Sequence, residues 1–310
     1  MRKVIGIGET VLDIIFRHNK PIGAVPGGST YNAMISLGRA GVPAQFIGET
    51  GNDRVGEMIR SFLEDNGVSA KHINVFDNSK SPLSLAFLDD NNDAEYLFYK
   101  DHPNDRLDFV LPEVGPDDIV LFGSYYAVNP VIRPQVKGFL DHARQCGAII
   151  YYDVNFRPTH RNEVVKLTSN VLENLELADI VRGSQEDFRV LYGLTEADKV
   201  YDAEISFYCK KFIYTRGAQP VELRAEGGLR KQYAVAPPAQ VVSTIGAGDN
   251  FNAGLIYGMM RHGITRDTID RGLSEAQWDE LVACGMQFSA ECCKSLDNYI
   301  STDYGLALQR

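Results

Sequence analysis

The sequence predicts an α/β fold in which helices flank a doubly wound, mostly parallel sheet. Two observations lead to this prediction. Short apolar segments of strand length alternate with longer segments whose apolar residues recur at helical spacing. Polar clusters also follow several expected strands, at the edge where such sheets bind ligands. Two parallel strands need a long crossover, which the intervening helices provide.

The beginning of the chain shows this alternation clearly. Residues 3–8 form a short apolar run typical of a buried strand, and residues 9–27 continue it with alternating polarity. A helix is expected over 29–41, with a serine as its N-cap and a glycine at its end. A strand over 44–48 and a helix over 53–66 follow.

Residues 73–106 interrupt the alternation. We expect short antiparallel strands here, joined by the polar turn 89–93. These strands are expected at 75–76, 84–88 and 95–99. An insertion of this kind in an otherwise alternating chain is a candidate lid or interaction surface.

The alternation resumes near residue 119 and continues to the end of the chain. The expected strands are 119–122, 148–153, 179–181, 212–215, 220–224 and 231–236. The expected helices are 131–145, 163–177, 184–192, 249–261, 276–294 and 303–309. Since the chain has no internal repeat, low-complexity segment or long linker, we expect residues 1–310 to form one domain.

Composition narrows the classes of function. Of the 310 residues, 44% are hydrophobic and 23% are charged, as in ordinary globular proteins. The net charge of −10 argues against nucleic acid or an anionic membrane surface as a partner. Because no 18-residue apolar run exists and the apolar start is short and broken by glycine, we expect a cytoplasmic protein. Five cysteines without CxxC spacing and six scattered histidines indicate neither disulfides nor a transition-metal site.

The most informative stretch is 243–251. Gly246 and Gly248 can adopt positive φ and let a ligand approach the backbone. A helical pattern follows, so the free N–H groups at the helix start form an anion site suited to phosphate. We infer that Asp249, facing this phosphate, takes a proton from an attacking hydroxyl group. The alternative is that Asp249 is only a helix N-cap.

Other polar clusters also fall where expected strands end. Ligands bind at the carboxyl ends of the strands in such sheets, so the shared position of these clusters indicates one site. The clusters are Asp13, Gly27-Gly28 with Asn32, Asp153 to Arg157, Thr215 to Gly217, and Gly246 to Asp249.

Over essentially the whole chain, these motifs resemble those of the ribokinase-like (PfkB-type) carbohydrate kinases, which include fructokinase and 2-keto-3-deoxygluconate kinase. The opening strand of that family is similar to residues 6–13, and its Gly-Gly-x-x-x-Asn helix is similar to residues 27–41. Its Gly-x-x-Gly-x-Asp-x-x-Gly element resembles residues 47–56. Its most specific motif, Thr-x-Gly-Ala-Gly-Asp, resembles residues 244–249. The resemblance implies a ribokinase-like fold with a small β-sheet lid formed by excursions at about 10–27 and 73–106.

The resemblance also implies a role for each matching residue. Asp249 matches the catalytic base, and the amides of Ala247 and Gly248, after Gly246, match an anion hole for the transferred phosphoryl group. Arg157 matches an arginine near the substrate and the phosphates. The sugar-binding positions match Asp13, Gly28, Asn32, Tyr99, Lys100 and Asp249. The nucleotide-binding positions match Ser184, Thr215, Gly217, Thr244, Gly246 and Gly248. Asp187 matches a residue linked to Mg²⁺, which it can reach through a water molecule.

The activity implied by this resemblance is transfer of the γ-phosphate of ATP to a hydroxyl group of a monosaccharide. The implied cofactors are ATP and Mg²⁺, with a monovalent cation as a further candidate. Fructose is the first expected acceptor. A sugar acid such as 2-keto-3-deoxygluconate is the second, because Arg157 and Lys100 can meet a carboxylate. Several family members pair through their lids, so a homodimer of this kind is expected.

Some positions depart from the family pattern and motivate a second hypothesis. Ser243 replaces an aspartate, and the Asn-x-x-Glu motif becomes Ser184 to Asp187. Pro220 replaces a glycine, and Lys100 stands where arginine is common. The alternative of another class is a non-catalytic sugar- or nucleotide-binding relative, although the intact base argues against it. A nicotinamide dehydrogenase is disfavoured because the Gly-x-Gly of the first strand lacks its third glycine.

Overall fold

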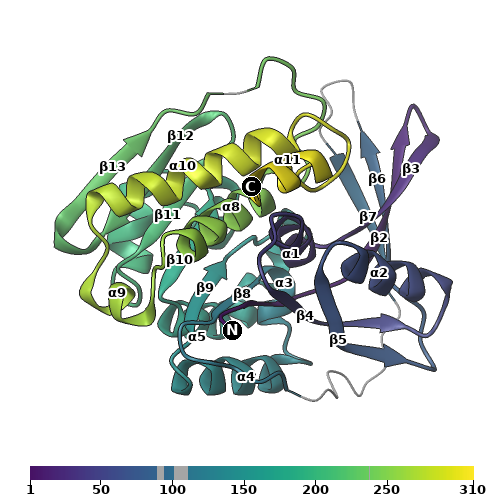
Figure 1. Ribbon diagram of the computed structural model, residues 1–310, viewed down its shortest axis with the longest axis horizontal. Helices are drawn as coiled ribbons and strands as arrows, with labels where there is room; N and C mark the ends of the chain where they lie inside the picture. The colour runs from purple at the N-terminus through teal and green to yellow at the C-terminus, as the bar shows by residue number, and fades with distance from the viewer. Residues whose placement is uncertain (89–93, 101–110, 237) are drawn as a thin grey trace.

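The alternating apolar segments form one large sheet at the centre of the structure (Figure 1). The structure is a computed structural model that describes residues 1–88, 94–100, 111–236 and 238–310. The strand order of this sheet is β13 (Leu229–Tyr233), β12 (Gln219–Ala225), β11 (Phe212–Arg216), β10 (Ile180–Ser184), β9 (Ile149–Asp153), β8 (Ile119–Gly123), β1 (Val4–Ile7), β4 (Ala44–Gly51) and β5 (Val68–Phe76).

The sheet is mostly parallel, as predicted. All neighbouring strands from β11 to β5 pair in parallel. Strands β12 and β13 extend the sheet in antiparallel pairing at the edge next to β11. The carboxyl ends of the parallel strands therefore share one edge, where a ligand site is expected.

Helices cover both faces of this sheet, which confirms the doubly wound arrangement. One apolar core holds side chains of α1 (Ser29–Arg39), α2 (Arg54–Asp65), α8 (Ala247–Arg261), α9 (Arg266–Arg271) and α10 (Glu275–Cys292). The core on the other face holds side chains of α3 (Ser124–Val128), α4 (Arg133–Gln145), α5 (Val164–Leu177), α6 (Gln185–Tyr192) and α7 (Ala197–Val200). Helix α11 (Thr302–Leu308) ends the chain.

The helices that the sequence did not predict are short ones. They are α3, α7, α9, the 3₁₀ segments Pro158–Glu163 and Glu226–Gly228, and the π-helical turn Tyr201–Ile205. A segment of one or two turns is too short to show apolar periodicity. In the part of the chain that the structure describes, no helix is long and apolar enough to cross a membrane.

A smaller four-stranded sheet stands apart from the larger one (Figure 1). Its order is β3 (Lys20–Gly27), β2 (Val11–Arg17), β6 (Leu83–Leu88) and β7 (Ala94–Tyr99). The pairs β2–β3 and β6–β7 are antiparallel. The segments 11–27, 83–88 and 94–99 are thus joined in one small sheet, as expected from the sequence.

One detail of the predicted lid is wrong. Residues 75–76 are not a lid strand, because they end β5, which pairs in parallel with β4 in the larger sheet. Strand β5 lies at the sheet edge and exposes Lys71, so its apolar pattern is interrupted. The antiparallel pairing expected between 84–88 and 95–99 is confirmed by β6 and β7, and β6 also pairs in parallel with β2. The predicted turn 89–93 and the end of the predicted lid, 101–106, lie outside the described residues.

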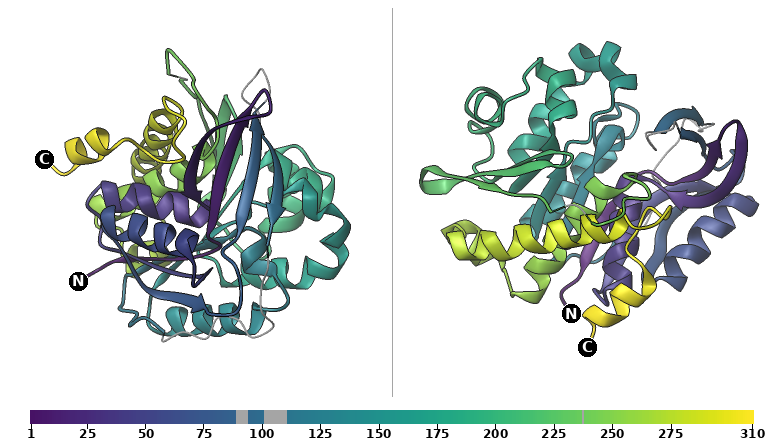
Figure 2. Two further views of the ribbon diagram at one scale, coloured as in Figure 1. Left: turned by 90° about the vertical axis from the view of Figure 1, so that its right-hand side faces the viewer. Right: turned by 90° about the horizontal axis from the view of Figure 1, so that it is seen from above.

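Helices α8 and α10 lie side by side (Figure 2), and glycines allow this close approach. A Cβ atom on Gly254 would lie 2.3 Å from the carbonyl oxygen of Cys284. A Cβ atom on Gly285 would lie 2.9 Å from the ring of Phe251. The position of α8, and of the turn before it, therefore depends on having glycine where α8 and α10 are in contact.

We expect Gly254→Ala to lower the free energy of unfolding by about 1–3 kcal/mol, because the added methyl group meets backbone that cannot move freely. The matched control is Gly138→Ala in α4, where an added Cβ would meet nothing within 4 Å. This control should raise stability by about 0.5–1 kcal/mol through helix propensity. Urea unfolding measures both, and a Gly254→Ala protein as stable as the control would contradict the packing argument.

Candidate active site

The turn before α8 has the geometry expected of an anion site. Gly246 is the N-cap of α8 with a φ of +77°, a conformation that favours glycine. The amide of Ala247 donates to the carbonyl oxygen of Thr244 at 3.2 Å. The amide of Gly248 has no acceptor within the described ranges, so it is free for an anion. Thr244 itself is exposed at this turn.

Asp249 lies in the first turn of α8, and it is buried. Its Oδ2 accepts a hydrogen bond of 2.8 Å from Nδ2 of Asn32, which lies on α1. Burial raises the pKa of Asp249 to about 7, although the Asn32 hydrogen bond favours the charged form. The N-cap is Gly246, and α8 has no side-chain capping bond, so Asp249 is not the helix cap. A carboxylate with this pKa can exchange a proton near neutral pH.

The predicted sugar-binding residues Asp13, Gly28 and Asn32 come from β2 and α1. Asp13 on β2 is buried, and its Oδ2 accepts a hydrogen bond of 3.2 Å from Nδ2 of Asn298. Burial raises the pKa of Asp13 to about 6. Gly28, with a φ of +125°, begins α1, and a Cβ there would lie 2.1 Å from the carbonyl oxygen of Glu9. The Oδ1 atom of Asn32 is buried without a hydrogen-bond partner in the described structure.

Arg157 follows β9 at the carboxyl edge of the larger sheet. Its positive charge acts on both buried carboxyl groups and favours their ionised forms, lowering the pKa values that burial raises at Asp13 and Asp249. The backbone nearby adopts positive φ at Ser124 and Asn155, whose side chains bond to each other at 2.6 Å. Such conformations are uncommon for these residues and cluster at functional sites.

The lid contributes Lys100, but it presents a different tyrosine from the one predicted. Lys100 Nζ lies 2.6 Å from Oε1 of Glu9, beside Asp13. By strand alternation, Tyr96 on β7 lies on the same face as Lys100. The charges of Asp13 and Asp249 both act on Tyr96. Tyr99 is on the opposite face and is 59% exposed. The period-2 alternation before Lys100 would have identified Tyr96.

The sequence reasoning also missed Arg182 on β10. Its Nη1 donates to Oδ1 of Asp153 at 3.0 Å, and its Nη2 donates to Oγ1 of Thr215 at 2.6 Å. The guanidinium lies beside the α8 turn, since a Cβ on Gly248 would be 3.0 Å from Nη2. The predicted nucleotide residue Thr215 is therefore held by a buried cation, and Gly217 follows in the next turn with a φ of +56°.

The residues predicted to organise a metal ion are bonded to each other. Oδ2 of Asp187 accepts from the Ser184 amide at 2.6 Å, and Oγ of Ser184 accepts from the Asp187 amide, which forms the capping box of α6. Burial and the nearby Asp153 raise the pKa of Asp187 to about 6. Within the described residues no group of three or more His, Cys, Asp or Glu side chains can hold a metal ion. Because Mg²⁺ keeps several waters and binds through one or two carboxylates plus substrate phosphates, the water-mediated role of Asp187 stays a prediction.

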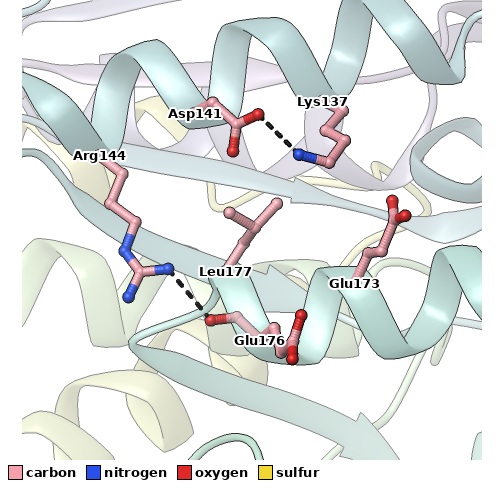
Figure 3. A pocket seen from close by; sticks show the side chains of 6 residues that line it. All are labelled: Lys137, Asp141, Arg144, Glu173, Glu176 and Leu177. Carbon is pink, nitrogen blue, oxygen red and sulfur yellow. Dashed lines mark hydrogen bonds and ion pairs between the residues drawn. The ribbon is translucent and has the colours of Figure 1, made fainter.

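A hollow of about 430 Å³ lies between α4 and α5, away from these residues (Figure 3). Its charges are largely paired, with Lys137 bonded to Asp141 at 2.7 Å and Arg144 to the carbonyl oxygen of Glu176 at 3.4 Å. It contains none of the predicted site residues, so it is not the candidate active site. Its lining residues are Lys137, Asp141, Arg144, Glu173, Glu176 and Leu177.

A large parallel sheet with a separate small sheet, and buried carboxylates beside a helix start, are the features that the resemblance to carbohydrate kinases predicts. Comparison with known proteins agrees, because residues 1–298 match the pfkB family of carbohydrate kinases. The chain belongs to this family, which confirms the resemblance inferred from the motifs.

Two curated relatives illustrate the similarity. The chain is 28% identical over 252 residues to a 5-dehydro-2-deoxygluconokinase of Geobacillus thermodenitrificans, covering 76% of this chain and 72% of that protein. It is 27% identical over 240 residues to the probable fructokinase-4 of Arabidopsis thaliana, covering 74% and 72%. These relatives have different sugar substrates in their names, so they agree on the class of enzyme and not on the acceptor.

Solved structures share the fold over the whole chain. Fructokinase from Vibrio cholerae O395, bound to fructose, ADP and a calcium ion, has a TM-score of 0.82 at 21% identity and covers 100% of this chain and 99% of its own. Aminoimidazole riboside kinase from Salmonella enterica, with aminoimidazole riboside and an ATP analogue, has a TM-score of 0.79 at 23% identity and covers both chains fully.

We expect Arg182→Met to lower the free energy of unfolding by about 3–5 kcal/mol, because it leaves Asp153 buried without its partner cation. The control is Arg189→Met, which removes an exposed pair with Glu186 and should cost at most about 0.5 kcal/mol. Denaturant unfolding measures both variants. Equal stability of the two would mean that Arg182 does not hold the buried carboxylates in place.

Proposed function

We propose that this kinase transfers the γ-phosphate of ATP to a hydroxyl group of a monosaccharide. The observation that carries the proposal is Asp249, a buried carboxylate with a pKa near neutrality beside the free amide of Gly248. Few structural roles require an acidic side chain there, whereas phosphoryl transfer needs a base next to an anion site. The complexes of related folds with ADP or an ATP analogue support ATP as the donor.

The proposed reaction uses the site residues as follows. Asp249 takes the proton of the acceptor hydroxyl group while the oxygen of that hydroxyl group forms a bond to the γ-phosphorus of ATP. The bond from this phosphorus to the bridging oxygen breaks, and ADP leaves. The Gly248 amide and Arg157 stabilise the charge on the moving phosphoryl group. Asp13 and the unpaired Oδ1 of Asn32 accept hydrogen bonds from other sugar hydroxyls and orient the acceptor.

Fructose is the acceptor that we propose first. A neutral ketose suits a site whose inner carboxylates accept hydrogen bonds, and a structural neighbour holds fructose. A sugar acid is the second candidate, and two observations favour it. Relatives are named 5-dehydro-2-deoxygluconokinase, and Lys100 is bound to Glu9, which a substrate carboxylate can replace.

A sugar panel with ATP and Mg²⁺, read by ADP release, tests the proposal. The panel includes fructose, ribose, 2-keto-3-deoxygluconate and 5-dehydro-2-deoxygluconate. The highest kcat/KM is expected with fructose, while a higher value with either acid identifies the second candidate. If no sugar raises ADP release above the sugar-free rate, the kinase proposal is wrong. Calorimetry with ATP and Mg²⁺ then decides whether the chain is a sugar-binding relative that takes no nucleotide.

The homodimer expected through the lid stays a prediction. The small sheet exposes several large apolar side chains, which supports it. They are Ile22, Leu97, Phe98 and Tyr99.

We expect Asp249→Asn to lower kcat by roughly three orders of magnitude, since the amide cannot accept the hydroxyl proton. Fructose binding should change little, because the substitution keeps the size of the side chain. Turnover and calorimetric titration measure these two effects separately. Near-normal turnover by this variant would rule out Asp249 as the base.

We expect kcat/KM for the sugar to fall about tenfold per pH unit below pH 7. Asp249 must be ionised to take a proton, and its pKa is about 7, so the loss occurs on the acid side. Below about pH 6 the slope should steepen as Asp13, with a pKa of about 6, is protonated as well. Initial rates from pH 5 to 9 at saturating ATP measure the profile. A flat profile would contradict the assignment.

A further inference from the structure

The loop between α10 and α11 reaches into the candidate active site from the far end of the chain. Its residue Asn298 is only 1% exposed. Nδ2 of Asn298 donates to Oδ2 of Asp13, the predicted sugar-binding carboxylate, which lies 285 positions earlier in the sequence. This contact was not foreseen by any motif, and the proposed function assigns it no role.

The backbone of the same residue contacts the turn that precedes α8. The carbonyl oxygen of Asn298 accepts a hydrogen bond of 2.8 Å from Nδ2 of Asn250, the neighbour of Asp249. A Cβ on Gly246 would lie 2.6 Å from that carbonyl oxygen, so the loop and the turn are in close contact. Asn298 therefore bridges the sugar-binding carboxylate and the turn that carries the proposed base.

The residues after Asn298 fix the loop in place. The hydroxyl of Tyr299 donates to the carbonyl oxygen of Pro26, at the base of β3. The amide of Ile300 donates to Oγ of Ser36 at 3.1 Å, and this hydroxyl donates to Oδ1 of Asn250 at 2.5 Å. Because the loop is tied to α1, α8 and the base of β3, the amide of Asn298 has a fixed position.

The hydrogen bonding of the Asn298 side chain shows which of its groups is used. Its Oδ1 is buried and has no donor among the residues that the structure describes. An unpaired buried acceptor is unfavourable, so Oδ1 does not hold the side chain in this orientation. The orientation of the Asn298 amide is set by Nδ2, which donates to the Asp13 carboxylate. Reversing the amide would place its oxygen against the carboxylate oxygen, which is repulsive.

We propose that Asn298 is a positioning residue that orients Asp13 for the sugar and holds it in register with the α8 turn. This inference rests on the proposed sugar-kinase function and deepens it. The bond from Asn298 to one carboxylate oxygen favours the Asp13 rotamer that accepts hydrogen bonds from the sugar, so its main effect is on sugar binding. The charged form of Asp13 is also favoured by this bond, against the burial that raises its pKa.

The test compares Asn298→Leu, Asn298→Asp and a control, Asn170→Leu. The control removes the hydrogen bond that Nδ2 of Asn170 donates to the carbonyl oxygen of Val128, away from the site. With fructose as the probe, both Asn298 variants should raise its KM, and its calorimetric Kd without ATP, by tenfold or more. Their kcat and their KM for ATP should stay within about threefold of the unchanged protein. The control should leave all four constants unchanged.

The aspartate variant adds a readout that a merely structural role would not move. Two carboxyl groups in contact can share a proton at pH 6 but repel each other at pH 8, so the loss of fructose affinity should grow between these values. The charged group of Arg157 and the Glu9–Lys100 pair also face Asp13, as do Tyr96 and Tyr299. Burial raises the pKa of both tyrosines, so neither titrates in this range.

Two results would overturn the inference. One is an Asn298→Asp protein whose affinity for fructose is within about twofold of that of the unchanged protein. This variant is nearly isosteric, so it keeps the packing and can be measured even if Asn298→Leu does not fold. The other is an equal loss in the constants for ATP and fructose, which would indicate a general structural role. Absence of turnover in the unchanged protein would count against the proposed function instead, and the direct binding measurement would still decide the role of Asn298.

Discussion

The structure depends on keeping three carboxyl groups in place within an apolar fold. Asp13, Asp153 and Asp249 are 7%, 3% and 7% exposed, and an unpaired buried carboxylate costs on the order of several kcal/mol. Each one accepts a hydrogen bond from a residue on a different element of the chain. The donors, in the same order, are Asn298, Arg182 and Asn32. The site is thus assembled by long-range bonds, and each bond also fixes two elements relative to each other.

These bonds require elements that approach closely. Helix α1 brings Asn32 to Asp249, and α8 holds its position because Gly254 and Gly285 let α10 pack against it. Glycines at the α1 and α8 starts, Gly28 and Gly246, let backbone approach where a side chain would collide. Helix packing and the geometry of the site therefore depend on the same glycines. These small residues allow the close approach of elements that brings the acidic side chains to their hydrogen-bond donors.

The electrostatic consequence suits phosphoryl transfer. A carboxylate with an ordinary pKa would be a weak proton acceptor next to the charge of a nucleotide. Burial raises the pKa of Asp249 towards neutrality, while Arg157 and Arg182 keep the ionised form accessible. Because the chemistry of phosphoryl transfer is mainly positioning and charge stabilisation, such an arrangement needs little else from the protein.

Local sequence patterns determined the class of fold and the central motif. The alternation of apolar segments, and the run from Thr244 to Asp249 before a helix, depend on neighbours in sequence and were visible in it. The tertiary structure decided that residues 75–76 belong to the edge strand β5, and that Tyr96 rather than Tyr99 faces the buried carboxyl groups. Both outcomes depend on which face each strand buries in its sheet. The bonds from Arg182 and Asn298 join residues 29 and 285 positions away, and no local pattern encodes such pairs. Only the tertiary structure brings them together, because burial of a carboxylate selects its partner in space.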